Sequence, residues 1–230
     1  MIKETINKLH SELPATVKLV AVSKFHPFEA IEEAYEAGQR IFAESRPQEL
    51  LAKVKRLEEI RAERGEQDYM SDIQWHFIGH LQTNKLKMVL PYVSLVQSVD
   101  SDRLLDAISA WGAANGRTID VLLEPHVAAE ETKQGFSPDE IMAVIADTGR
   151  YGNIRFRGIM GMATFTDDES VIRDDFSRLR DIYKKATGLD PDLSEYFTEL
   201  SIGMSDDYPV AIEYGSTMVR IGSMIFGTRS

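Results

Sequence analysis

The sequence VKLVAVSK, from Val17 to Lys24, decides the fold. Residues 19–22 form an unbroken apolar run, which is typical of a parallel strand covered on both faces. Lys24 is therefore expected at the carboxyl end of a buried strand. Ligands of parallel α/β proteins bind at that end, so Lys24 is a candidate functional residue. The alternative is an ordinary surface lysine, since lysines are common in exposed loops.

Seven more strand-like segments follow, and a helix or a helical turn comes after each. They are predicted at 40–43, 73–78, 93–99, 119–123, 154–162, 197–202 and 217–221. Eight such units favour a single (β/α)8 TIM barrel over residues 1–230, because a chain of about 200 to 250 residues commonly forms one such barrel. An open doubly wound sheet is the alternative, although at this length it more often has about five or six strands.

Composition excludes several classes of function. The net charge of −11 argues against a nucleic-acid partner, which normally meets a basic face. The absence of cysteine excludes disulfides and thiolate metal sites. His76 and His80 lie across a strand and its turn rather than on one helix face, so no metal site is predicted. Neither an apolar leader nor an apolar run of about 18 residues occurs, so we expect a cytoplasmic protein without a membrane span.

In a barrel, the carboxyl ends of all eight strands meet on one face. The residues predicted there are Lys24, Glu44, Ser45, Gly79, Asn84, Asp100, His126, Thr164, Ser201, Gly203, Ser205, Gly222 and Ser223. The last two strand ends are rich in glycine and serine, and barrels frequently hold a phosphate in these loops. The alternative is that these are ordinary turn residues.

Two cations accompany the predicted phosphate site. An amine in a partly apolar mouth loses some preference for its charged form, and a neutral lysine forms a Schiff base with an aldehyde. Lys24 has this position, beside the predicted eighth strand. Arg220, on that strand, would keep its charge there. Together a lysine, a phosphate site and a buried arginine suggest pyridoxal 5′-phosphate as the cofactor.

Three long motifs, in order, resemble the YggS-type pyridoxal-phosphate homeostasis proteins. They are VAVSK at 20–24, WHFIGHLQTNK at 75–85, and LSIGMSDDY at 200–208 followed by GSTMVRIGSMIFGTR at 215–229. The resemblance runs from end to end and implies a barrel of the alanine racemase N-terminal domain type. It also implies a protein that holds pyridoxal phosphate as a Lys24 aldimine, and that buffers or delivers it without strong catalysis, in transient contact with apoenzymes that need it. We expect a monomer, because a closed barrel can stand alone and no long exposed apolar stripe argues for obligate assembly.

The same resemblance implies roles for individual residues. Ser201 would bind the phosphate together with the backbone amides of Gly222 and Ser223, and Arg220 would face the pyridine nitrogen and keep it unprotonated. The other residues expected to line the cofactor are Ser45, Met204, Ser205 and Thr217.

The sequence departs from the family pattern at two strand ends. The usual FGENYxQE reads FAESRPQE here, so Ala43 adds a methyl group and Ser45 shortens a donor. Pro125 stands in Glu-Pro-His, where the family has Q-x-N or Q-x-H, and a proline in a central strand would remove a ladder hydrogen bond. These changes predict altered geometry at the second and fifth strand ends.

Two other functions stay open. A racemase-like enzyme would need acid–base groups on both faces of its substrate, and barrel relatives supply one from a second domain. The sequence ends at Ser230, eight residues past Gly222, which leaves no room for that domain, so we expect no strong catalysis. The other alternative is an engineered barrel with an installed activity, whose new site would lie near Glu44 and His126.

Overall fold

Eight parallel strands form a closed barrel in the computed structural model, which describes residues 1–127, 135–189 and 193–227. Each strand pairs with the next along the chain, and β8 pairs with β1 to close the ring, with Lys18 beside Met218 and Ala21 beside Ile221. The strands are β1 (Lys18–Val22), β2 (Ile41–Glu44), β3 (Gln74–Phe77), β4 (Val93–Val99), β5 (Ile119–Leu123), β6 (Ile154–Met160), β7 (Glu199–Ser201) and β8 (Met218–Ile221). The predicted (β/α)8 fold is confirmed.

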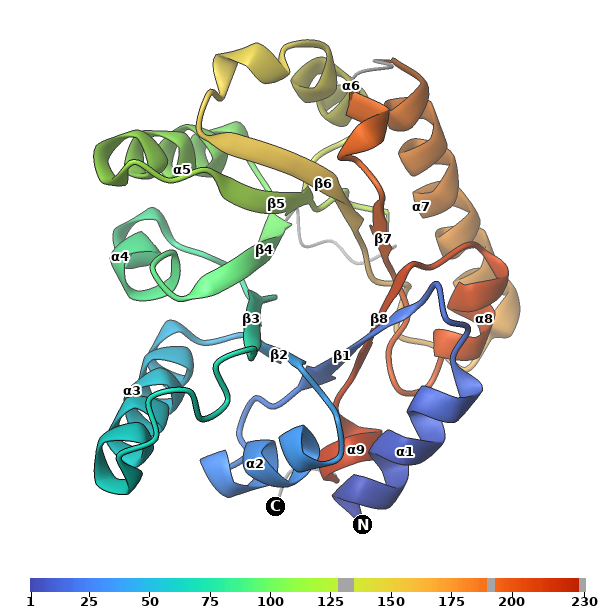
Figure 1. Ribbon diagram of the computed structural model, residues 1–230. Helices are drawn as coiled ribbons and strands as arrows, with labels where there is room; N and C mark the ends of the chain where they lie inside the picture. The colour runs from blue at the N-terminus through green and yellow to red at the C-terminus, as the bar shows by residue number, and fades with distance from the viewer. Residues whose placement is uncertain (128–134, 190–192, 228–230) are drawn as a thin grey trace.

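Helices surround this barrel (Figure 1). They are α1 (Ile2–Glu12), α2 (Phe28–Glu36), α3 (Pro47–Arg64), η1 (Thr83–Lys85), α4 (Leu86–Val89), α5 (Asp102–Asn115), α6 (Pro138–Ala146), η2 (Thr148–Arg150), α7 (Glu169–Leu189), η3 (Leu193–Glu195), α8 (Tyr208–Glu213) and α9 (Ser223–Phe226). Their ends follow local chemistry: α3 and α5 end at Gly65 and Gly116 in the left-handed conformation, and Ser137 caps α6 with its side chain. No described helix is both long and apolar enough to cross a bilayer.

Two apolar clusters separate the outside of the barrel from its inside. The larger cluster fills the space between strands and helices. The smaller one lies within the barrel and consists of Val20, Val22, Ala43, Leu95, Leu122, Met160 and Met218. Because side chains alternate along a strand, this inner set shows which positions point inward. On β1 the inward series Val20, Val22 leads to Lys24, and on β8 Met218 leads to Arg220.

Strand boundaries differ from the prediction where neighbouring groups take the backbone hydrogen bonds. Predicted segment 197–202 shrinks to Glu199–Ser201 because the N–H of Phe197 bonds to the carbonyl of Leu193 in a turn. Predicted segment 154–162 ends at Met160. Just beyond it, the carbonyl of Gly161 accepts a hydrogen bond from Arg220. Residues 228–230, at the end of the last sequence motif, lie outside the described residues.

Candidate functional site

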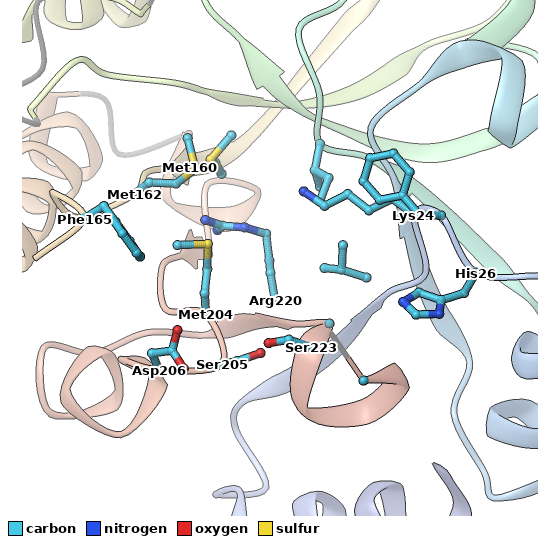
Figure 2. A pocket seen from close by; sticks show the side chains of 15 residues that line it. Lys24, His26, Met160, Met162, Phe165, Met204, Ser205, Asp206, Arg220 and Ser223 are labelled. Carbon is cyan, nitrogen blue, oxygen red and sulfur yellow. The ribbon is translucent and has the colours of Figure 1, made fainter. Parts of the chain in front are cut away.

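A cavity of about 650 Å³ opens at the carboxyl end of the barrel (Figure 2). Its size lies within the roughly 300–1,000 Å³ range of small-molecule sites. The walls come from the ends of β1, β3, β6, β7 and β8. The residues of the predicted site that line it are Lys24, Met204, Ser205, Arg220, Gly222 and Ser223. Six of the nine predicted cofactor residues therefore share one cavity.

Lys24 follows β1 by two residues and points into the cavity, toward Arg220 (Figure 2). The chain on both sides of it is held in place. Before it, the Ser23 hydroxyl donates to Glu44 Oε1 at 2.6 Å, and the Ser23 carbonyl accepts from Lys53 Nζ at 2.7 Å. After it, Phe25 has a positive φ of 67°, and its N–H donates to a carboxylate oxygen of Glu49 at 2.9 Å. These contacts and this turn fix the position of the Lys24 backbone, from which its side chain extends.

Arg220 lies buried at the floor of the cavity. One guanidinium nitrogen donates to the carbonyl and the hydroxyl oxygen of Ser201 at 2.7 and 2.8 Å, and the other donates to the carbonyl of Gly161 at 2.9 Å. Burial lowers the pKa of Arg220 to about 10, which still leaves the group charged at neutral pH. The site therefore holds a fixed positive charge.

A chain of buried hydrogen bonds runs from Arg220 through the barrel. The Ser201 hydroxyl donates to Gln97 Oε1 at 2.7 Å, and Gln97 Nε2 donates to His76 Nδ1 at 2.9 Å. Burial lowers the pKa of His76 to about 3, so its ring is neutral and can accept at Nδ1. The sequence reasoning missed Gln97, although a glutamine within the apolar segment 93–99 is a signal of a buried polar contact.

The loops after β7 and β8 offer backbone donors to the cavity. In the described ranges, the N–H groups of Ser205, Gly222 and Ser223 donate to no protein acceptor. Gly222 lets the chain pass close to β1, because a Cβ there would lie 3.0 Å from the carbonyl oxygen of Val22. Gly203 has φ +97° and a Cβ there would lie 2.6 Å from that of Ala211. Three unused N–H groups fit an anionic group such as a phosphate.

Three of the predicted cofactor residues do not reach this cavity. The hydroxyl of Ser201 is used by Arg220 and Gln97, and Ser201 does not line the cavity. Thr217 precedes β8, so it lies at the opposite end of the barrel, where its hydroxyl bonds to Leu200 and Glu199. Ser45 does not line the cavity, and its carbonyl packs so closely on Gly79 that a Cβ there would lie 2.0 Å away.

The two departures from the family pattern are accommodated. Ala43 is fully buried in the inner apolar cluster, so its methyl group fills the barrel. Pro125 lies beyond the end of β5, in an isolated bridge with Phe136. The neighbours of the proline make the bonds of that bridge, since Phe136 N–H donates to the Glu124 carbonyl and His126 N–H donates to the Phe136 carbonyl. The prediction that Pro125 would remove a ladder bond is therefore wrong.

Glu124 is a second titratable group at this end of the barrel. Leu122 points inward, so alternation aims the side chain two residues later toward the inside of the barrel, although Glu124 is not one of the residues that line the cavity. Burial and the negative charge of Asp100 raise the pKa of Glu124 to about 7, against the opposing effect of Arg220 and His80. The ring nitrogen Nδ1 of His80 lies 3.0 Å from Asp100 Oδ2. From the sequence, Glu124 is notable only because Glu-Pro-His replaces the family's Q-x-N or Q-x-H.

Comparisons with known proteins agree with this arrangement. The family model described as alanine racemase, N-terminal domain, matches residues 1–230. The chain is 36% identical to a pyridoxal phosphate homeostasis protein of Aquifex aeolicus over 92% of this chain and 87% of that one. It is 37% identical to the mouse protein of that name, over 99% of this chain and 83% of the relative. A structure of PipY from Synechococcus elongatus with PLP bound is 32% identical, with a TM-score of 0.85 over 99% of this chain and 100% of that chain.

Proposed function

The chain belongs to the alanine racemase N-terminal domain family, among its pyridoxal phosphate homeostasis proteins, and from this membership we propose that it binds pyridoxal 5′-phosphate at Lys24 and buffers or delivers it. The observation that carries the proposal is that Lys24, Arg220 and three residues with unused backbone N–H groups line one cavity with apolar walls. When bound, the cofactor supplies an aldehyde that condenses with an amine. The donors and the cavity fit the three parts of the cofactor that a protein can recognise: its aldehyde, its phosphate and its ring nitrogen.

Each part of the cofactor has a matching group in the chain. Lys24 would hold the aldehyde carbon. The N–H groups of Ser205, Gly222 and Ser223 would donate hydrogen bonds to the phosphate. Arg220 would face the ring nitrogen, and because an arginine only donates hydrogen bonds, that nitrogen would stay unprotonated. A ring nitrogen without a proton withdraws electrons weakly, which supports a storage role rather than strong catalysis.

A storage and delivery role also needs a partner. We infer that the monomeric protein works in the cytoplasm and makes transient contact with apoenzymes that need the cofactor. The cavity mouth opens at the carboxyl end of the barrel, between the loops that follow β1, β6, β7 and β8. A receiving protein would therefore approach this end.

Glu124 favours one second candidate, a racemase-like enzyme. A carboxyl group whose pKa lies near 7, at the same end of the barrel as the cavity, is suited to move a proton at neutral pH. Lys24 could act on one side of a substrate and Glu124 on another. Racemisation of amino acids by the loaded protein, lost in both Lys24→Ala and Glu124→Gln, would establish this candidate in place of storage.

The visible absorbance spectrum tests the main proposal. Purified protein is titrated with pyridoxal phosphate, reduced with borohydride and digested for peptide mapping. We expect a new visible band and a reduced cofactor attached at Lys24. Lys24→Ala should show neither, whereas Lys55→Ala, which removes an exposed lysine of α3, should behave as the wild type. A folded wild-type protein without the band, or a cofactor attached elsewhere, would contradict the proposal.

A further inference from the structure

Five exposed apolar side chains surround the cavity mouth, and we call them the apolar rim. They are Phe25, Met162, Phe165, Met204 and Met224. Four of them belong to the lining of the cavity, and Met224 adjoins it because its N–H donates to the hydroxyl of Ser205. In the described ranges nine large apolar side chains are exposed, and five of these nine gather here. Figure 2 shows Phe165, Met162 and Met204 together on one side of the cavity.

The barrel itself does not need these side chains. They lie in loops beyond β1, β6 and β7 and on the short α9, outside both apolar clusters. Phe165 is 92% exposed, so its ring gains almost nothing from packing. Exposed apolar residues scattered singly are normal, but a group of them on one face marks an interaction site. Methionine adapts its shape to different surfaces, which suits contact with more than one partner.

The charges on the Phe165 side of the rim indicate the kind of partner, whereas on the Phe25 side the exposed Arg46 lies over the Phe25 ring and is paired with Glu49. Exposed Asp167 and Asp168 follow Phe165, and exposed Asp206 follows Met204 and lines the cavity. An apoenzyme must bind the doubly negative phosphate of the cofactor, so the entrance to its empty site is electropositive. An acidic flank beside an apolar patch complements such an entrance. A second copy of this chain, with a net charge of −11, would be repelled.

We propose that the apolar rim is the surface on which an apoenzyme that needs pyridoxal phosphate docks, with its empty cofactor site over the cavity. This inference rests on the proposed function and adds where the partner binds. A partner docked on the rim covers the opening of the cavity. The cofactor would then pass between two proteins in contact, without first entering bulk solvent: water would cleave its bond to the Lys24 amine and restore the free aldehyde, which would condense with an amine of the apoenzyme and release water.

Reactivation of an apoenzyme measures this docking. The loaded protein is mixed with a cofactor-free aminotransferase, in the presence of a phosphatase that destroys free pyridoxal phosphate. We expect the wild type to restore aminotransferase activity despite the phosphatase. The double variant Phe165→Ser/Met224→Ser should restore it about tenfold more slowly, because a few central apolar residues dominate such contacts. The cofactor band of each variant is recorded first, so that loading is measured separately.

Matched controls use apolar residues at the other end of the barrel. Tyr92 is 37% exposed and precedes β4, and Tyr196 is 44% exposed and lies between η3 and β7. Tyr92→Ser and Tyr196→Ser should transfer the cofactor as fast as the wild type. Sedimentation of the loaded protein alone would show whether the rim instead pairs two copies of the chain.

The outcomes separate the docking surface from the function beneath it. Full loading with transfer abolished by the phosphatase in the wild type would overturn docking and leave storage intact. Equal transfer by the rim variant and the wild type, or a dimer that the rim variant abolishes, would overturn the rim as the apoenzyme surface. A wild-type protein that does not load at all would overturn the proposed function and, with it, this inference.

Discussion

Arg220 donates from one nitrogen to both the carbonyl and the hydroxyl oxygen of Ser201, at 2.7 and 2.8 Å. The same hydroxyl donates onward to Gln97, so Ser201 links the cation at the cavity floor to the buried polar chain that ends at His76. A fully satisfied network of this kind holds its members in one geometry. We therefore propose that Ser201 acts on the cavity through Arg220 and not by touching a ligand.

Ser201→Ala tests this reading of the serine. The substitution leaves Gln97 Oε1 without its donor, and an unsatisfied buried group costs about 1–3 kcal/mol of unfolding free energy. The affinity for pyridoxal phosphate should fall less than tenfold, because the hydroxyl does not line the cavity. Urea denaturation and an absorbance titration measure the two effects. A large loss of affinity with unchanged stability would show that Ser201 binds the phosphate after all.

Glu124 should make stability depend on pH. Its pKa rises from 4.5 to about 7 on folding, so the folded protein keeps a proton that the unfolded chain releases. The contribution of this group to the free energy of unfolding therefore falls as the pH rises through this window, by about 1–3 kcal/mol. Glu124→Gln removes the titration, so the variant should gain stability relative to the wild type between pH 5 and pH 8. Urea denaturation at both pH values checks this, and parallel changes in the two proteins would contradict it.

The buried ion pair of Lys53 and Glu44 supports the chain next to Lys24. Lys53 Nζ lies 2.5 Å from Glu44 Oε1, and both side chains are buried. Lys53→Met leaves an uncompensated buried carboxylate, which should cost about 3–5 kcal/mol. The cost should be smaller at pH 5 than at pH 8, because burial already raises the pKa of Glu44 and loss of the lysine raises it further.

Two further variants isolate the charge effect. Lys53→Met/Glu44→Leu should recover much of the lost stability, since no charge remains buried. Lys8→Met breaks an exposed pair with Glu12, 3.8 Å away, and should cost less than about 1 kcal/mol. Urea midpoints compare all three. If Lys53→Met proved as mild as Lys8→Met, the buried pair would have no special role.

Hydrophobic patterning explains how much of this fold the sequence reveals. Segments 93–99 and 119–123 match β4 and β5 residue for residue, because a buried parallel strand is a short apolar run with abrupt ends. The closing pair β8–β1 follows from the count of units. The fine geometry does not follow, because alternation assigns Ser201 to the inside but cannot say that Arg220 and Gln97 use its hydroxyl. The motif gives the order of Thr217 along the chain, but not that Thr217 precedes β8, at the end of the barrel opposite the cavity.

Some functional features at this end of the barrel could likewise be predicted from the sequence, and others could not. Lys24 and Gly222 could be predicted, since each follows a strand at the end where barrels bind ligands. Glu124 could not be given a role, because its raised pKa depends on Asp100 and on burial that only the packed barrel creates. The apolar rim could not be predicted from the sequence either. Its members come from separate loops, and no local pattern shows that they share one face.

Gly222 gives the sharpest test of the backbone donors. A methyl group added there would lie 3.0 Å from the Val22 carbonyl oxygen and 3.2 Å from the Val22 Cβ, so the loop and β1 must move apart by a few tenths of an ångström. The N–H groups of residues 222 and 223 would then move from their positions at the cavity. Gly222→Ala should therefore weaken binding of pyridoxal phosphate about tenfold, as expected when a phosphate loses part of its backbone contacts. Gly149→Ala is the matched control, because a Cβ at that glycine meets nothing within 4 Å. An absorbance titration gives both affinities, and equal values for the two variants would show that these amides do not hold the phosphate.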